Sequence, residues 1–160
     1  MNQKIVETIK KYELIQNEDK IVLAVSGGPD SICMLNILNE IKSENLLKFQ
    51  FEIVVAHVNH MIRKEAKEDE EYVKQICRKI GVEFFSKSID VENLANNNKI
   101  GTEEAGRIAR YSYFDEIADK TNSNKIAIAH NKNDQAETII MHILRGSGIT
   151  GLKGIEIKRR

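Results

Sequence analysis

A glycine-rich turn near the start of this 160-residue sequence offers its clearest chemistry. Residues 21–31 read IVLAVSGGPDS, so five apolar residues run directly into Ser26-Gly27-Gly28-Pro29-Asp30-Ser31. Two adjacent glycines have no Cβ atoms, so their backbone N–H groups can approach a ligand closely. A helical apolar pattern follows from Ile32 to Ile41, and the N-terminus of a helix attracts anions. We therefore expect a phosphate site here, the alternative being a tight turn that binds nothing.

Two further segments carry charged residues at helical spacing. Asp134 and Glu137 are three positions apart, so on a helix their carboxylates are neighbours that suit a metal ion or a substrate ammonium group. A solvated acidic first turn explains them equally well. Arg107 and Arg110 are also three apart, and two guanidinium groups on one helix face could stabilise phosphate charge. An ion pair within the helix, such as Glu103 with Arg107, is at least as good an explanation.

The histidines and cysteines form no recognisable metal site. His57, His60 and His130 have a spacing that matches no zinc pattern, and we expect hydrogen-bonded structural roles for them. Cys33 and Cys77 both lie inside apolar helical patterns and are 44 positions apart. Buried thiols are therefore expected rather than a disulfide or a metal site.

The hydrophobic pattern predicts alternating strands and helices that would position these residues. The segment 21–25 is a continuous, β-branched run of the kind found in strands buried on both faces. The asparagine-rich segment 92–101 is the most loop-like, and Thr102 is a plausible N-cap of the helix after it. We expect strands over 21–25, 51–58, 82–89 and 125–129, the last of them buried, and helices over 5–12, 32–41, 65–80, 102–118 and 134–144.

This alternation predicts an α/β fold with a doubly wound (Rossmann-like) parallel sheet and helices on both faces. The length suggests one domain, residues 1–160. Ligands of such sheets bind beyond the carboxyl ends of the strands, where the strand order reverses. The segments that follow three of the expected strands, 26–31, 57–60 and 130–137, are therefore expected around the site.

Composition limits the choice of partners and compartment. Lys plus Arg equals Asp plus Glu at 24 each, so the overall charge does not indicate a nucleic-acid partner. Any affinity for RNA would come from a local patch of basic residues or from sequence not present here. No apolar run reaches the roughly 20 residues that span a bilayer, and the N-terminal segment lacks the features of a secretory signal. We expect a cytoplasmic protein without a membrane partner.

The string Ser-Gly-Gly-x-Asp-Ser resembles the pyrophosphate loop of the ATP pyrophosphatase (PP-loop) superfamily, whose fold is adenine nucleotide α-hydrolase-like. The resemblance implies that the loop binds the phosphates of ATP and that AMP is transferred with release of pyrophosphate. It also implies that Asp30 helps hold Mg2+, a role that we favour over the alternative of a favourable charge at a helix N-terminus. The ATP-binding residues carried over are Ser26, Gly27, Gly28, Pro29, Asp30, Ser31 and His57.

Longer strings resemble the N-terminal catalytic domain of the tRNA(Ile)-lysidine synthetase family, namely HVNHMIRKEAKEDEEYVKQIC, EEAGRIARY and AHNKNDQAETIIMHILRGSGITGLKGI. The resemblance implies ATP-dependent adenylation of the anticodon wobble cytidine of an isoleucine tRNA with a CAU anticodon. Free L-lysine then displaces AMP to give lysidine. Arg110 would stabilise developing charge, and His130 would lie near the adenylated centre. Asp134 and Glu137 would recognise the lysine, and a homodimer is left open.

The sequence departs from the family pattern in three places. Asn131 and Asn133 stand where a histidine and an aspartate are usual, and Met61 replaces a glycine. The chain ends soon after Gly154, so we expect a domain truncated at its C-terminal end, with further tRNA-binding domains absent. The alternatives are a PP-loop tRNA thiolase, disfavoured by the lack of paired cysteines, and a non-catalytic ATP-binding fragment.

Overall fold

The computed structural model describes residues 2–59, 66–130, 132–144 and 154–157. The chain divides into two compact units, Met1–Ile128 and Ala129–Arg160. The first unit contains the sheet and most of the helices, and the second contains the helix α6 (Lys132–Leu144).

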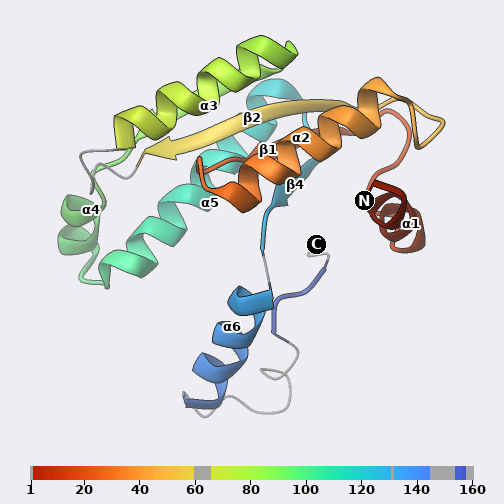
Figure 1. Ribbon diagram of the computed structural model, residues 1–160. Helices are drawn as coiled ribbons and strands as arrows, with labels where there is room; N and C mark the ends of the chain where they lie inside the picture. The colour runs from red at the N-terminus through yellow and green to blue at the C-terminus, as the bar shows by residue number, and fades with distance from the viewer. Residues whose placement is uncertain (1, 60–65, 131, 145–153, 158–160) are drawn as a thin grey trace. The chain divides into compact units, whose positions relative to one another are not determined.

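A four-stranded parallel sheet forms the centre of the first unit (Figure 1). From edge to edge its strands are β3 (Glu83–Ser88), β2 (Glu52–Asn59), β1 (Lys20–Ala24) and β4 (Lys125–Ile128). The chain builds outward from β1 through β2 to β3, and then places β4 on the other side of β1. The order therefore reverses between β1 and β4, as the prediction of a doubly wound sheet requires.

Helices cover both faces of the sheet, which confirms the expected layering. Because strand residues alternate between faces, Leu23 and Val25 pack with residues of α1, α2 and α3, whereas Val22 and Ala24 pack with Tyr113 of α5. All of these strand residues are buried, as the continuous apolar run predicts. The helices are α1 (Asn2–Lys11), α2 (Pro29–Ser43), α3 (Ala66–Ile80), α4 (Val91–Asn98) and α5 (Thr102–Thr121).

The predicted loop over 92–101 is wrong, because most of it forms α4. Asp90 caps this helix by accepting a hydrogen bond from the backbone N–H of Asn93 at 3.0 Å. Val91 and Ala95 are buried on one face, and Lys99 ends the helix in a left-handed conformation. The asparagines lie on the exposed face, where they make the segment look like a loop in sequence without preventing a helix.

Three smaller expectations also fail. Gly101, not Thr102, is the N-cap of α5. β4 is half-buried rather than buried, because in the described part of the chain it pairs with β1 alone and lies at the edge of the sheet. Cys77 is buried as expected but Cys33 is exposed, and both thiols are free. By contrast, Gly81 ends α3 with a φ of +70°, the role that its position in the sequence predicts.

A buried carboxylate joins the amino ends of β1 and β4. Asp19 is 4% exposed, and its carboxylate accepts hydrogen bonds from Lys125 Nζ at 2.6 Å, Asn124 Nδ2 at 2.7 Å and the backbone N–H of Gln16. Burial raises the pKa of this carboxyl, but the hydrogen bonds from Lys125, Gln16 and Asn124 outweigh it and lower the pKa overall. The network holds the edge strand beside β1.

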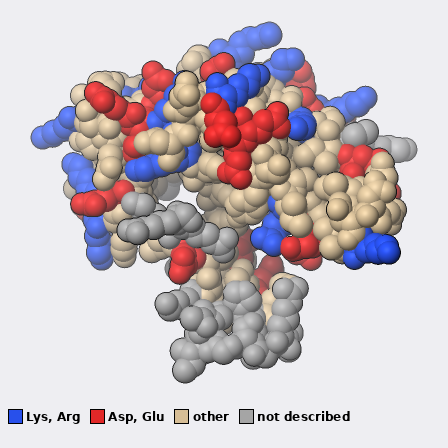
Figure 2. Space-filling view, turned by 180° about the vertical axis from the view of Figure 1, so that it is seen from behind, with Lys and Arg blue, Asp and Glu red and all other residues tan. Residues whose placement is uncertain are grey.

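The surface carries both charges without a clear separation on the side shown in Figure 2, where basic and acidic side chains are interspersed. This agrees with the equal numbers of basic and acidic residues in the sequence. Within the described ranges, no helix is both long and apolar enough to cross a membrane.

Candidate functional site

The glycine turn connects β1 to α2 at the carboxyl edge of the sheet. Gly27 has a φ of +93°, a left-handed conformation that side chains strongly disfavour. Gly28 is the N-cap of α2 with an extended backbone, and Pro29 is the first residue of the helix. In the described part of the chain, no side-chain hydrogen bond caps this helix at Gly28. Its first N–H groups therefore keep their capacity to bind an anion.

Two serine hydroxyls hold the shape of the turn. Ser31 is 5% exposed, and its Oγ donates to the carbonyl of Gly28 at 2.9 Å and accepts the backbone N–H of Ser26 at 3.2 Å. Ser26 Oγ lies 3.2 Å from Ser31 Oγ and accepts a long hydrogen bond of 3.4 Å from Gly28 N–H. The hydroxyl of Ser31 is thus engaged within the turn, whereas Ser26 is exposed.

His57 of β2 holds the residue that precedes the turn. It lies inside β2 and is 2% exposed, with Nδ1 only 2.8 Å from the carbonyl oxygen of Val25. A carbonyl oxygen only accepts, so Nδ1 carries the proton and donates. The backbone N–H of Val25 donates to the carbonyl of Ala56 at 3.0 Å. Both backbone polar groups of the residue before the turn are therefore held by β2.

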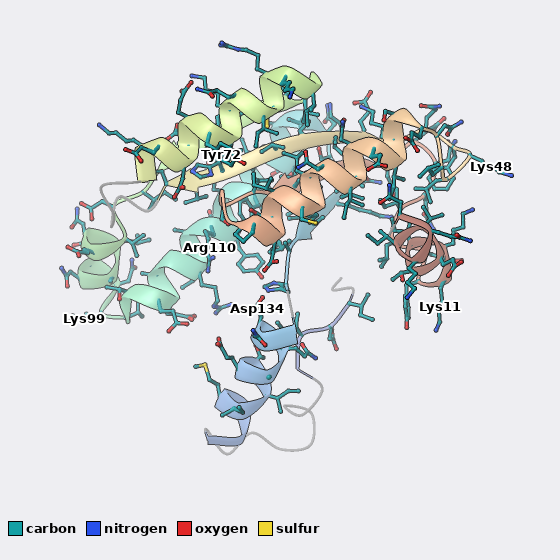
Figure 3. All side chains as sticks on the ribbon, viewed as in Figure 1. Lys11, Lys48, Tyr72, Lys99, Arg110 and Asp134 are labelled. Atoms are coloured by element: carbon teal, nitrogen blue, oxygen red, sulfur yellow. The ribbon has the colours of Figure 1, made fainter. Side chains whose placement is uncertain are left out.

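The two arginines of α5 differ in their surroundings. Arg107 donates to both carboxylate oxygens of Glu104, at 2.6 and 3.0 Å, and this hydrogen bonding raises its pKa. The ion pair within the helix is therefore the correct explanation for Arg107, although its partner is Glu104 and not Glu103. Arg110 is exposed on the same helix (Figure 3).

The second unit holds the other predicted site residues on or beside α6. Nδ1 of His130 lies 3.7 Å from a carboxylate oxygen of Asp134, and both side chains are partly exposed. Asp134 and Glu137 fall three residues apart on the helix, as the spacing predicts, and Glu137 is exposed. The side chain of Gln135 accepts the backbone N–H of Ile155 at 2.7 Å, which anchors the following segment to α6.

Comparison with known proteins shows the family to which the chain belongs. The model of the PP-loop domain, an ATP-binding family, matches residues 1–160. The chain belongs to the PP-loop family. It is 53% identical over 152 residues to a tRNA(Ile)-lysidine synthase of Clostridium acetobutylicum, covering 94% of the chain and 32% of the relative. The corresponding enzyme of Clostridioides difficile is 51% identical over 157 residues, covering 98% of the chain and 33% of that protein.

The chain thus spans about a third of the length of these curated relatives. Among solved structures, the U34-tRNA thiolase NcsA from Methanococcus maripaludis matches with a TM-score of 0.75 at 18% identity, covering 93% of this chain and 51% of that one. An NH3-dependent NAD synthetase from Campylobacter jejuni matches with a TM-score of 0.53 at 14% identity, covering 99% and 79%. At these identities the structural matches show the PP-loop fold alone.

One residue beside the PP-loop was not predicted from the sequence. Asp69, in the first turn of α3, lies so close to Gly27 that a Cβ added to that glycine would be 3.2 Å from the Asp69 Cβ and 3.6 Å from its Oδ1. Because α3 follows β2, its N-terminus returns to the carboxyl edge of the sheet. That topology is the signal that could have indicated Asp69, but the spacing of residues along the sequence gives no sign of the contact.

A second acidic residue of α3, Glu70, links the carboxyl ends of two neighbouring strands. Glu70 accepts hydrogen bonds from Ser86 Oγ at 2.6 Å and from Asn59 Nδ2 at 3.2 Å, which links the carboxyl ends of β3 and β2. The hydrogen bond from Ser86 lowers the pKa of Glu70 most, burial opposes it, and Asn59, His57 and Lys74 lower it further. Asp69 is thereby carried on a helix turn that is fastened to the sheet.

The structure brings together the predicted PP-loop residues from Ser26 to Ser31, and His57 contacts Val25 immediately before them. His57 lies inside β2 and not at its end, so it supports the loop by positioning Val25. Several positions that carried the family resemblance lie outside the described residues, namely His60, Met61, Asn131, Gly146–Gly148 and Gly151.

Proposed function

We propose that the chain provides the nucleotide-binding part of a tRNA(Ile)-lysidine synthase. The observation that carries the proposal is its identity of 53% and 51% to two proteins of that name over nearly all of its length. In the proposed reaction, ATP adenylates the C2 carbonyl oxygen of the wobble cytidine in an isoleucine tRNA with a CAU anticodon. Pyrophosphate leaves in this step. The ε-amine of free L-lysine then attacks C2, and the C2–O bond breaks as AMP leaves.

The PP-loop geometry suits the first step. The N–H groups at the start of α2 and the positive end of its dipole would bind the phosphates of ATP. Gly28 has an extended backbone, and among the described residues a Cβ there would meet Ser26 Oγ alone, at 3.5 Å, so a phosphate can approach its main chain closely. Ser31 and His57 keep the loop in this shape before ATP arrives, which reduces the ordering that binding requires.

Asp30 is the residue we propose for holding Mg2+ beside the phosphates. It is exposed in the first turn of α2, where a carboxylate can join phosphate oxygens around the ion. The other magnesium ligands in this proposal are phosphate and water oxygens. Bound there, Mg2+ would neutralise negative charge on the phosphates.

The remaining roles in the proposal rest on the sequence resemblance. Arg110 stabilises the charge that develops during adenylation, and His130 acts near the adenylated cytidine. Asp134 and Glu137 bind the ammonium group of lysine. Because the substrates are tRNA, ATP and free lysine, we place the activity in the cytoplasm. A homodimer is the assembly to test by light scattering.

Lysine transfer to tRNA tests the proposed function directly. We expect radiolabelled lysine to enter an isoleucine tRNA with a CAU anticodon when the chain replaces the matching region of the Clostridium acetobutylicum relative. A methionine tRNA with the same anticodon is the control substrate, and the unaltered relative is the positive control. If the chimaera folds and binds ATP but transfers no lysine, the proposed substrate is wrong and a non-catalytic ATP-binding role is favoured.

Replacing Glu137 with glutamine should separate the use of lysine from the use of ATP. A charge-assisted hydrogen bond contributes about 1.5–3 kcal/mol, so we expect KM for lysine to rise about 10- to 100-fold in the chimaera. KM for ATP should stay within about twofold, since the proposed contact is to lysine alone. An equal loss for both substrates would indicate that Glu137 has a general structural role.

Cysteine chemistry of the thiolase type is disfavoured by the surroundings of the two thiols. Burial raises the pKa of the Cys77 thiol to about 11, so it is protonated at neutral pH and unreactive. Cys33 is exposed on α2, 44 positions away in sequence. The resemblance to NcsA therefore concerns the fold of the PP-loop domain.

A further inference from the structure

Asp69 places a negative charge beside the PP-loop, where the proposed ligand is itself negative. Its Cβ and carboxylate lie against Gly27, the residue whose left-handed backbone creates the turn. The residue is exposed. In the described part of the chain, Asp69 has no hydrogen bond or ion pair that would neutralise it.

The approach to this contact is open. A shallow groove of about 670 Å³ begins at Gly27 and Pro29 and runs along α2, with Tyr72 of α3 on its opposite side. Figure 3 shows Tyr72 on the side of α3 that faces α2. Tyr72 is one helical turn beyond Asp69. Among the described residues, the groove is open to solvent beside Gly27, so ions and phosphate groups can reach this side of the loop.

Two electrostatic effects therefore act in opposite directions on an anion at the loop. The N-terminus of α2 attracts phosphate, whereas the Asp69 carboxylate repels it. The balance depends on how much charge the phosphates carry. Mg2+ removes two units of that charge, which weakens the repulsion.

We infer that Asp69 makes the PP-loop selective for the magnesium complex of its nucleotide over the metal-free form. The inference rests on the proposal that the loop binds ATP, and it gives Asp69 a role in specificity and not in bond formation. Two unit charges about 6 Å apart in a partly solvated site interact with an energy that corresponds to about a tenfold change in affinity. Asp69→Asn removes this charge with little change of size.

The experiment measures the dissociation constants of ATP and of inorganic pyrophosphate by calorimetry, in excess MgCl2 and in EDTA at equal ionic strength. For Asp69→Asn we expect metal-free ATP to bind about tenfold more tightly than it binds to the wild type. Asp69→Glu keeps the charge and should keep the wild-type preference for the magnesium complex. Glu68→Gln, in the same helix turn, is the control for a general change of charge. Asp69→Ser is a second variant that removes the charge. Circular dichroism checks that each variant is folded.

Each outcome is informative about one of the two proposals. If the wild type binds ATP, and the ratio of the two constants is the same in Asp69→Asn and Asp69→Ser as in the wild type, the inference is wrong. The inference is also wrong if Glu68→Gln changes this ratio as much as Asp69→Asn does. It is wrong, too, if the neutral variants lose affinity for magnesium ATP alone, because Asp69 would then be a metal ligand. A folded wild type that binds neither ATP nor pyrophosphate would instead contradict the proposed function.

Discussion

Asp30→Ala should abolish magnesium-dependent exchange of pyrophosphate into ATP while leaving the fold intact. If this carboxylate holds the magnesium ion beside the phosphates, its removal should lower the exchange rate by at least about 100-fold, which corresponds to about 3 kcal/mol of lost transition-state stabilisation. The residue is exposed at the start of α2, where its charge favours the helix by about 0.3–1 kcal/mol, a loss that a folded domain should tolerate. Exchange is measured with labelled pyrophosphate in the chimaera, and unfolding with a thermal scan.

Glu40→Ala is the matched control, because Glu40 is an exposed acidic residue of the same helix, distant from its N-terminus. It should leave exchange unchanged. If Asp30→Ala retained most of the exchange activity, the proposed magnesium role of Asp30 would be wrong.

Asp19→Ala should have the largest effect on stability. The substitution leaves Lys125 Nζ, Asn124 Nδ2 and the Gln16 N–H without the carboxylate to which they donate, in a site that is almost closed to water. Breaking a buried pair of this kind costs about 3–5 kcal/mol. Chemical denaturation of the wild type and variant should show the loss. Glu52→Ala is the control, since it removes an exposed ion pair with Lys20 and should cost less than about 1 kcal/mol.

The same network predicts how stability depends on pH. The folded pKa of Asp19 is lower than its unfolded value of about 3.9, so the unfolded chain binds a proton more readily. The contribution of Asp19 to stability is therefore fully present above about pH 4 and is lost as the pH falls through the folded pKa. In Asp19→Asn this part of the acid dependence should be missing. An identical acid profile in the two proteins would mean that Asp19 does not couple to folding.

The sequence predicts most of the first unit because its strands are continuous apolar runs and its glycine turn has a distinctive composition. It fails where exposed polar residues hide a buried stripe, as in α4, where five polar residues, Glu92, Asn93 and 96–98, surround the buried Val91 and Ala95. It also fails for contacts between distant segments. Neither the hydrogen bond of His57 to Val25 nor the approach of Asp69 to Gly27 has any local signature, because each depends on the register of β2 beside β1.

The conformation of Gly27 limits how this loop can evolve. A side chain at that position meets two obstacles, a torsion angle that disfavours L-amino acids and the nearby carbon atoms of Asp69. A mutation of Asp69 to alanine would remove its carboxylate but keep the Cβ atom at 3.2 Å, so it would reduce the second obstacle and leave the first. No single compensating substitution elsewhere can therefore open position 27 to other amino acids, whereas position 69 can vary on its own. Among homologous sequences, we expect the glycine to persist even in lineages that have lost the aspartate.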